Sequence, residues 1–119
     1  MAGEVSWVFK VAVNDGALEE FRALVAEMND ANEAAEPDTL TYEWFLADDD
    51  STVHLYERYV DNAAAMNHVA RFGENFAGRF LALLSVTGVD IYGPAGADLK
   101  QALAGFSPTY YASIGGFAR

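Results

Sequence analysis

The sequence predicts an α+β domain of the ferredoxin-like class, in which a split βαβ chain forms an antiparallel sheet with helices on one face. The prediction depends on the length of 119 residues and the hydrophobic content of 52%. It also depends on the spacing of apolar residues, which alternates along the chain between the period of two that is typical of strands and the spacing of three or four that is typical of helices. We expect one domain, 1–119, with a core at about 5–92 and a C-terminal extension at 97–119. A chain of this length can bury a core without disulfides or a structural metal.

The first strand is predicted over residues 4–13, because apolar side chains there recur with a period of two. These side chains are Val5, Trp7, Phe9, Val11 and Val13. Asp15 in the following Asn-Asp-Gly turn is expected to be the N-cap of a helix from 17 to about 35. The apolar stripe of this helix consists of Leu18, Phe21, Leu24, Val25 and Met28. The Glu-Pro-Asp segment at 36–38 is expected to end it.

The next two strands are predicted to form a hairpin. The second strand places Leu40, Tyr42, Trp44 and Leu46 on one face. The acidic run at 48–51 is expected to be a solvated tip, because a calcium site needs further oxygen ligands at fixed spacing. The third strand places Val53, Leu55, Glu57 and Tyr59 on one face, and His54, Tyr56 and Arg58 on the other.

A second helical region follows the hairpin. Asp61 is expected to cap its first helix, and the buried stripe there consists of Ala65, Val69 and Phe72. Gly73 is expected to break this helix. A further helical stretch would carry Phe76, Phe80, Leu81 and Leu84 inward. The remaining expected elements are a fourth strand at 86–92, a turn at 93–96, a short helix at 97–104 and a strand-like tail at 110–117.

Both faces of the predicted sheet carry large apolar side chains. On the second strand, Tyr42 and Trp44 lie on one face and Phe45 lies on the other. Because helices cover only one face of such a sheet, the other face needs a partner, and a second copy of the chain is the simplest one. We therefore expect a homodimer, with the aromatic tail as an arm in that contact.

Charge and cysteine content exclude several classes of function. The chain has 7 Lys and Arg against 18 Asp and Glu, a net charge of −11, which opposes binding to nucleic acid or to a membrane surface. It has no Cys, which excludes a thiol nucleophile, a disulfide framework and an iron–sulfur cluster. Since the sequence shows neither a signal-peptide pattern nor an apolar run of about 20 residues, we expect a cytoplasmic protein.

Several motifs resemble the antibiotic biosynthesis monooxygenase family. They are Glu-Pro-Asp-Thr-Leu-Thr-Tyr-Glu at 36–43, Tyr-Glu-Arg-Tyr-Val-Asp at 56–61, and the helical segment 64–68 followed by Phe72. The resemblance covers about 5–92 and implies a dimeric α+β barrel. The family's Gly and Trp are replaced by Asp38 and Tyr59. Heme-degrading relatives carry an Asn in the first strand, where this chain has Trp-Val-Phe-Lys at 7–10, so heme cleavage is disfavoured.

The resemblance implies the chemistry of the cofactor-free members of the family. A bound quinol or phenolic aromatic loses a proton, its anion passes an electron to O₂, and the two radicals combine. Such a protein supplies an apolar slot, one base and one hydrogen-bond donor, and needs no cofactor or metal. Two other functions remain open: a non-redox enzyme of aromatic catabolism on the same barrel, and a small-molecule-binding protein without catalysis.

His68 is the candidate base, since it borders the apolar stripe of its helix and an ordinary pKa near 6.5 suits proton transfer. The alternative is a histidine packed at the helix edge and hydrogen-bonded to the sheet. Asn67 and Tyr59 are the other candidate catalytic residues, with Asn67 as a donor. Candidates for binding the substrate are Tyr42, Trp44, Tyr56, His54, Arg58 and Phe72.

Each of these binding candidates also has a structural interpretation. Aromatic strand residues usually belong to the core, and Asn67 fits a solvent-facing helix position. Arg58 could instead form a cross-strand salt bridge with Glu43. His54 faces either a dimer partner or solvent. No metal site is expected, because neither H-x-H nor H-x-x-x-H spacing occurs.

Overall fold

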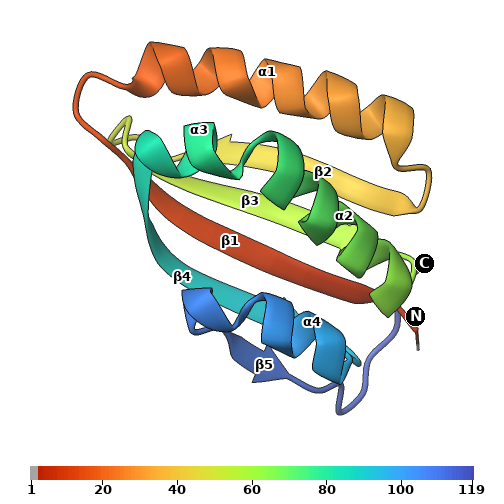
Figure 1. Ribbon diagram of the computed structural model, residues 1–119. Helices are drawn as coiled ribbons and strands as arrows, with labels where there is room; N and C mark the ends of the chain where they lie inside the picture. The colour runs from red at the N-terminus through yellow and green to blue at the C-terminus, as the bar shows by residue number, and fades with distance from the viewer. Residues whose placement is uncertain (1–2) are drawn as a thin grey trace.

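The computed structural model describes residues 3–119, which form a five-stranded sheet of order β2-β3-β1-β4-β5 (Figure 1). The strands are β1 (Val5–Val13), β2 (Thr39–Leu46), β3 (Thr52–Tyr59), β4 (Leu84–Tyr92) and β5 (Thr109–Tyr111). The helices are α1 (Leu18–Ala35), α2 (Asn62–Asn75), α3 (Ala77–Ala82), α4 (Ala97–Ala102) and the 3₁₀ helix η1 (Ala104–Phe106).

The helices cover one face of the sheet, which confirms the α+β, ferredoxin-like class (Figure 1). The prediction of an antiparallel sheet is wrong at one edge, because β5 pairs in parallel with β4 and the sheet is therefore mixed. The physical reason is the connection: the chain crosses over through α4 and η1 before it returns beside β4, and such a crossover permits parallel pairing.

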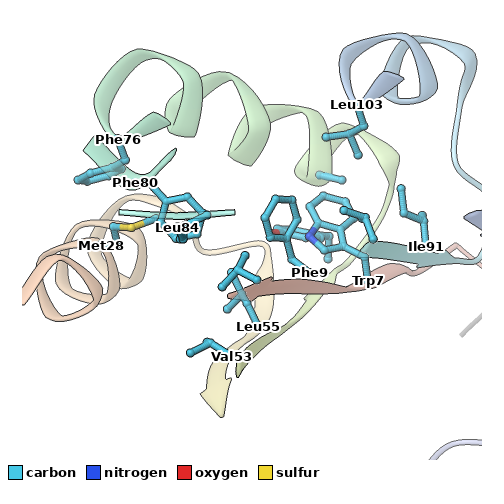
Figure 2. Packing of buried hydrophobic residues seen from close by; sticks show 14 of the residues in the cluster. Trp7, Phe9, Met28, Val53, Leu55, Phe76, Phe80, Leu84, Ile91 and Leu103 are labelled. Carbon is cyan, nitrogen blue, oxygen red and sulfur yellow. The ribbon is translucent and has the colours of Figure 1, made fainter. Parts of the chain in front are cut away.

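The core lies between the helices and the covered face of the sheet. Along β1, buried and partly exposed side chains alternate without interruption, as a half-covered strand requires. Figure 2 shows Trp7 and Phe9 of β1 pointing toward the helices, with Leu55 of β3 beside them and Phe80 of α3 across from them. The helix-covered face therefore holds both the hydrophobic core and the large aromatic rings.

The predicted face of the second strand needs one correction. Leu40 was expected to share a face with Tyr42 and Trp44, but its side chain is 48% exposed. The register of β2 against β3 shifts between Thr39 and Thr41, and this irregularity takes Leu40 out of the alternation. Tyr42 and Trp44 pack against the core as expected.

Two predicted helix boundaries are wrong. Asp15 does not cap α1: the helix begins after Ala17, which makes no side-chain cap. Instead, the carbonyl of Asn14 accepts a hydrogen bond of 3.0 Å from the amide of Ala17, which orders the turn. Gly73 does not break α2, which continues to Asn75, because a single glycine costs a helix only about 1 kcal/mol. Asp61 caps α2 as predicted, accepting a hydrogen bond from the amide of Ala64.

The elements after Gly73 also differ from the prediction in detail. Phe76 and Phe80 are buried as expected, but Leu81 is 39% exposed and Leu84 begins β4. The expected helix at 97–104 ends at Ala102 and continues as η1. The expected strand at 110–117 is shorter, since β5 ends at Tyr111; further along, the glycines at 115 and 116 have positive φ angles. No helix among residues 3–119 is long and apolar enough to cross a membrane.

Candidate active site

A cavity of about 220 Å³ lies between the sheet and the helices. Aromatic rings make up much of its wall: Trp7, Phe9, Tyr42, Phe72, Phe80 and Phe106. Two ionisable side chains, Glu57 and His68, also line it. A cavity that is mostly apolar and carries a few converging polar groups is the usual form of a small-molecule site.

His68 lies between two carboxylates. Its Nδ1 is 2.9 Å from Oε1 of Glu36, and its Nε2 is 3.1 Å from Oε1 of Glu57. The three residues come from separate elements, since Glu36 follows α1, Glu57 belongs to β3 and His68 belongs to α2. All three side chains are buried, so solvent screens these contacts only weakly.

Each carboxylate is held by further donors. Glu36 accepts hydrogen bonds from Oγ1 of Thr39 at 2.8 Å and from Nε of Arg71 at 2.9 Å. Glu57 accepts hydrogen bonds from the indole of Trp7 and the hydroxyl of Tyr59. Buried carboxylates need such partners, because an unpaired buried charge is strongly destabilising. The network fixes both carboxylates against the imidazole.

The network changes the protonation of His68. Burial opposes a charged imidazole, but the hydrogen bonds and charges of Glu36 and Glu57 outweigh it and raise the pKa of His68 to about 9. For Glu36, burial is again outweighed, by His68, Thr39 and Arg71, and its pKa is lowered. The expectation of an ordinary histidine pKa near 6.5 is therefore wrong. At neutral pH both ring nitrogens are protonated and donate to the carboxylates.

Tyr42 has a different environment at the same site. Its hydroxyl is buried without a hydrogen-bond partner among the described residues, and its ring lies 5.4 Å from that of His68. Burial raises the pKa of Tyr42 far above its ordinary value. Besides the aromatic cavity, Tyr42 lines a polar groove that also contains Asn32 and Glu36. Asn32 lies close enough to lower this pKa slightly, so the Tyr42 hydroxyl is a donor without a well-formed hydrogen bond, placed between the aromatic cavity and the polar groove.

The structure brings several of the predicted site residues together. His68, Tyr42 and Phe72 line the cavity. Tyr59 packs behind the lining, with its ring 5.3 Å from that of His68. Trp44 lies beside Tyr42, at a ring distance of 5.4 Å, and its indole donates to the side-chain oxygen of Asn29 rather than into the cavity.

The other predicted residues lie elsewhere. Asn67 is exposed on α2 and borders a groove outside the cavity. His54, Tyr56 and Arg58 lie on the open face of the sheet, opposite Glu57 and Tyr59. The interpretation of Arg58 as a partner of Glu43 is wrong.

The partner of Arg58 follows from strand pairing. Its Nε lies 2.5 Å from Oε1 of Glu4, which immediately precedes β1. Residue Ser6 of β1 is directly opposite Arg58, whereas Glu43 of β2 is opposite Tyr56, so Glu43 is two positions out of register.

Sequence reasoning missed five members of the network: Glu36, Glu57, Trp7, Thr39 and Arg71. Glu57 carried a usable signal, because a carboxylate in the middle of an apolar strand face must find buried partners. Glu36 carried none, since its place beside Pro37 is typical of a helix end, and its contact with His68 spans 32 positions. In the described part of the chain, residues 3–119, no three His, Cys, Asp or Glu side chains are arranged to hold a metal ion.

Solved structures share this fold. MupZ from Pseudomonas fluorescens superposes with a TM-score of 0.87 at 22% identity, covering 98% of this chain and 95% of that one. SnoaB from Streptomyces nogalater, a cofactor-independent oxygenase, superposes with a TM-score of 0.65 at 22% identity, covering 81% of this chain and 97% of SnoaB. Rv0793 from Mycobacterium tuberculosis superposes with a TM-score of 0.66 at 23% identity, covering 78% of this chain and 96% of Rv0793. At these identities the likeness shows the fold alone.

No curated protein matches the sequence. The family model described as antibiotic biosynthesis monooxygenase matches residues 5–72, which is more than half of the chain. This segment runs from β1 to α2 and contains the network of Glu36, Glu57 and His68. The chain therefore belongs to the antibiotic biosynthesis monooxygenase family.

Proposed function

We propose that this protein is a cofactor-independent monooxygenase that oxidises a quinol or another phenolic aromatic with O₂. The observation that carries the proposal is the buried Glu36–His68–Glu57 network in the wall of an aromatic cavity. Family membership supports it, as does the likeness in fold to SnoaB, which is itself a cofactor-independent oxygenase. The cavity supplies a dry aromatic slot, and the network supplies a proton acceptor.

The proposed reaction balances without a cofactor. A phenol with a ring C–H loses its hydroxyl proton, and the phenolate passes one electron to O₂ to give a phenoxyl radical and superoxide. The radicals combine at the ring carbon, and protonation gives a hydroperoxide. Loss of water then leaves a quinone, so that one phenol and one O₂ give one quinone and one water. The substrate provides all the electrons that reduce O₂.

The network provides an acceptor for the substrate proton. Glu57 lines the cavity, so its carboxylate can accept the proton of a bound phenol. Both ring nitrogens of His68 are already protonated at neutral pH, so Nε2, 3.1 Å from Glu57, and Nδ1, 2.9 Å from Glu36, act as donors that orient the two carboxylates. The positive charge of the imidazolium stabilises the phenolate that forms beside it.

The remaining site residues have supporting roles in this proposal. The free hydroxyl of Tyr42 donates a hydrogen bond to the oxygen of the phenolate. Tyr59 and Trp7 hold Glu57 in position through their hydrogen bonds and are positioning residues. Asn67 has no contact with the cavity, and we assign it no contact with the substrate.

We also propose a homodimer that forms through the open face of the sheet. Phe45, Tyr56 and Tyr92 are 54%, 36% and 38% exposed, which is a large apolar area for a solvent-facing sheet. Light scattering is expected to give the mass of two chains, and Phe45→Glu to reduce it to one. A wild-type mass of one chain contradicts the homodimer but leaves the proposed reaction intact.

Oxygen uptake tests the proposed reaction. Metal-free protein is given a panel of hydroquinones and naphthoquinols in the presence of a chelator, with heat-denatured protein as the blank. We expect saturable uptake that His68→Ala lowers about 100-fold or more, since removing one group that stabilises developing negative charge costs roughly that much. His54→Ala, on the open face, is the matched control and is expected to retain the wild-type rate.

Three other outcomes would contradict the proposal. Turnover of an aromatic substrate in the absence of O₂ favours a non-redox enzyme on the same fold. Binding without any turnover favours a small-molecule-binding protein. Uptake equal to the blank for every compound removes the support for oxygenation of quinols.

A further inference from the structure

The C-terminal extension forms one wall of the cavity. Three residues of the extension line the cavity: Ala102 of α4, Leu103, which precedes η1, and Phe106 of η1. All three lie beyond the matched family segment of 5–72. The ring of Phe106 meets that of Phe9 edge to face, with ring centres 5.2 Å apart. Figure 2 shows Leu103 entering from the extension above Phe9 and Trp7. The extension is therefore a part of the candidate site.

The extension is held firmly in place. Oδ1 of Asn62, at the start of α2, accepts a hydrogen bond of 2.6 Å from the amide of Gly96, and Nδ2 of Asn62 donates to Asp98 at 2.9 Å. A Cβ atom at position 96 would lie 2.7 Å from the Asp98 carboxylate and 2.9 Å from the Asn62 amide, so a side chain there would displace both groups from their hydrogen bonds. Leu99 and Leu103 are buried beneath α4.

The two ends of the cavity differ in chemistry. On the side of β2 and β3, Tyr42, Glu57 and His68 provide polar atoms. On the side of β4, the wall consists of apolar side chains, including Val89 and Phe106. A ligand with one polar end therefore enters with a defined orientation, its hydroxyl toward β2 and its rings toward η1.

The volume limits the length of such a ligand. A cavity of about 150 Å³ accommodates one benzene ring. The cavity here, at about 220 Å³, is half as large again, which suits a ligand of two fused rings better than one of three. Phe106, packed edge to face against Phe9, forms part of the apolar wall.

We propose that Phe106 is a specificity-determining residue that limits the ligand of this site to planar phenols of two fused rings. The assignment of the hydroxyl end rests on the proposed function, whereas the size limit depends only on the cavity. Truncating Phe106 would open the apolar end, and a larger side chain there would shorten the cavity.

Calorimetric titration without O₂ tests the size limit, with 2-naphthol and 2-hydroxyanthracene as the probes. We expect wild-type protein to bind 2-naphthol in preference to the three-ring phenol. Phe106→Ala is expected to shift the ratio of the two affinities about tenfold or more toward 2-hydroxyanthracene, because the added ring then gains burial. Tyr111→Ala changes an aromatic side chain of the same extension outside the cavity, and should leave the ratio unchanged.

A second variant keeps the test decisive if Phe106→Ala does not fold. Phe106→Trp fills more of the apolar end and is expected to weaken 2-naphthol binding relative to phenol. An unchanged ratio in the Phe106 variant that folds overturns the size limit, as does a wild-type protein that binds neither probe. Binding with the expected ratios but without oxygen uptake under air contradicts only the proposed reaction, so the two failures are distinguishable.

Discussion

The two faces of the sheet use the same kinds of residue for different purposes. On the covered face, Glu57 of β3 is buried and pairs with His68. On the open face, neighbouring residues of the same strand, His54 and Arg58, are exposed or partly exposed. Because successive side chains of a strand point to opposite faces, a shift of one position separates a buried ionic network from ordinary surface charge. The candidate chemistry therefore depends on burial, and residue type alone does not determine it.

The largest expected difference between the faces concerns the two strand glutamates. Glu57→Ala removes the acceptor for Trp7, Tyr59 and His68, and is expected to lower the free energy of unfolding by about 3–5 kcal/mol. Glu43→Ala, on the open face, should change it by less than about 0.5 kcal/mol. Urea denaturation followed by circular dichroism measures both. Equal effects would contradict the distinction between the faces.

The raised pKa of His68 predicts a loss of stability at alkaline pH. Its folded pKa of about 9 exceeds the ordinary value of 6.5, so the stabilisation is fully present below pH 6.5 and disappears as the pH rises through 9. The difference corresponds to about 3 kcal/mol. Urea denaturation at pH 6.5 and pH 9.5 should show this loss in wild-type protein and in His54→Gln. His68→Gln should lack this loss. A free energy of unfolding that depends on pH no more strongly in the wild type than in His68→Gln would contradict the prediction.

The buried hydroxyl of Tyr42 predicts a gain in stability when it is removed. An unsatisfied buried polar group costs about 1–3 kcal/mol, so Tyr42→Phe is expected to stabilise the protein by about 1 kcal/mol. The same change should reduce oxygen uptake, since the donor to the phenolate is lost. Tyr56→Phe, on the open face, should alter neither property. Destabilisation by Tyr42→Phe would mean that the hydroxyl has a partner in solution.

The ion pair of Arg58 with Glu4 gives the smallest expected effect. The side chain of Arg58 is 35% exposed, so solvent weakens the pair. Arg58→Ala is expected to cost less than about 1 kcal/mol in unfolding free energy, and added salt should reduce this further. Thermal melts at low and high ionic strength measure it. A salt-independent loss of several kcal/mol would place this pair in the same class as the buried network.

The sequence predicted much of the covered face, because the strand period is strict. It identified Tyr59 and Glu57 as members of the buried face of β3, and it identified His68 at the border of the helical stripe. The partners of His68 were not predictable, since Glu36 approaches it only after α1, β2 and β3 have packed together. The pKa of His68 follows from those partners and was missed with them.

Errors in the fold have local causes. The irregularity at Leu40 and the continuation of α2 through Gly73 both reflect tertiary packing that outweighs local preference. The parallel pairing of β5 depends on the direction in which the extension returns to the sheet. The spacing of apolar residues predicts that a segment is a strand, but it does not predict the direction of that strand. That the first part of the extension lines the cavity was also not predicted from the sequence.

The protonation state of His68 can be measured directly. ¹⁵N-detected NMR of the imidazoles would be recorded from pH 5 to pH 10.5, with signals assigned by their loss in His68→Ala and His54→Ala. We predict that both ring nitrogens of His68 are protonated at neutral pH and that the residue titrates near pH 9. A midpoint at or below pH 6.5 would contradict the ionic network and, with it, the proposed role of the His68 imidazolium in stabilising the phenolate.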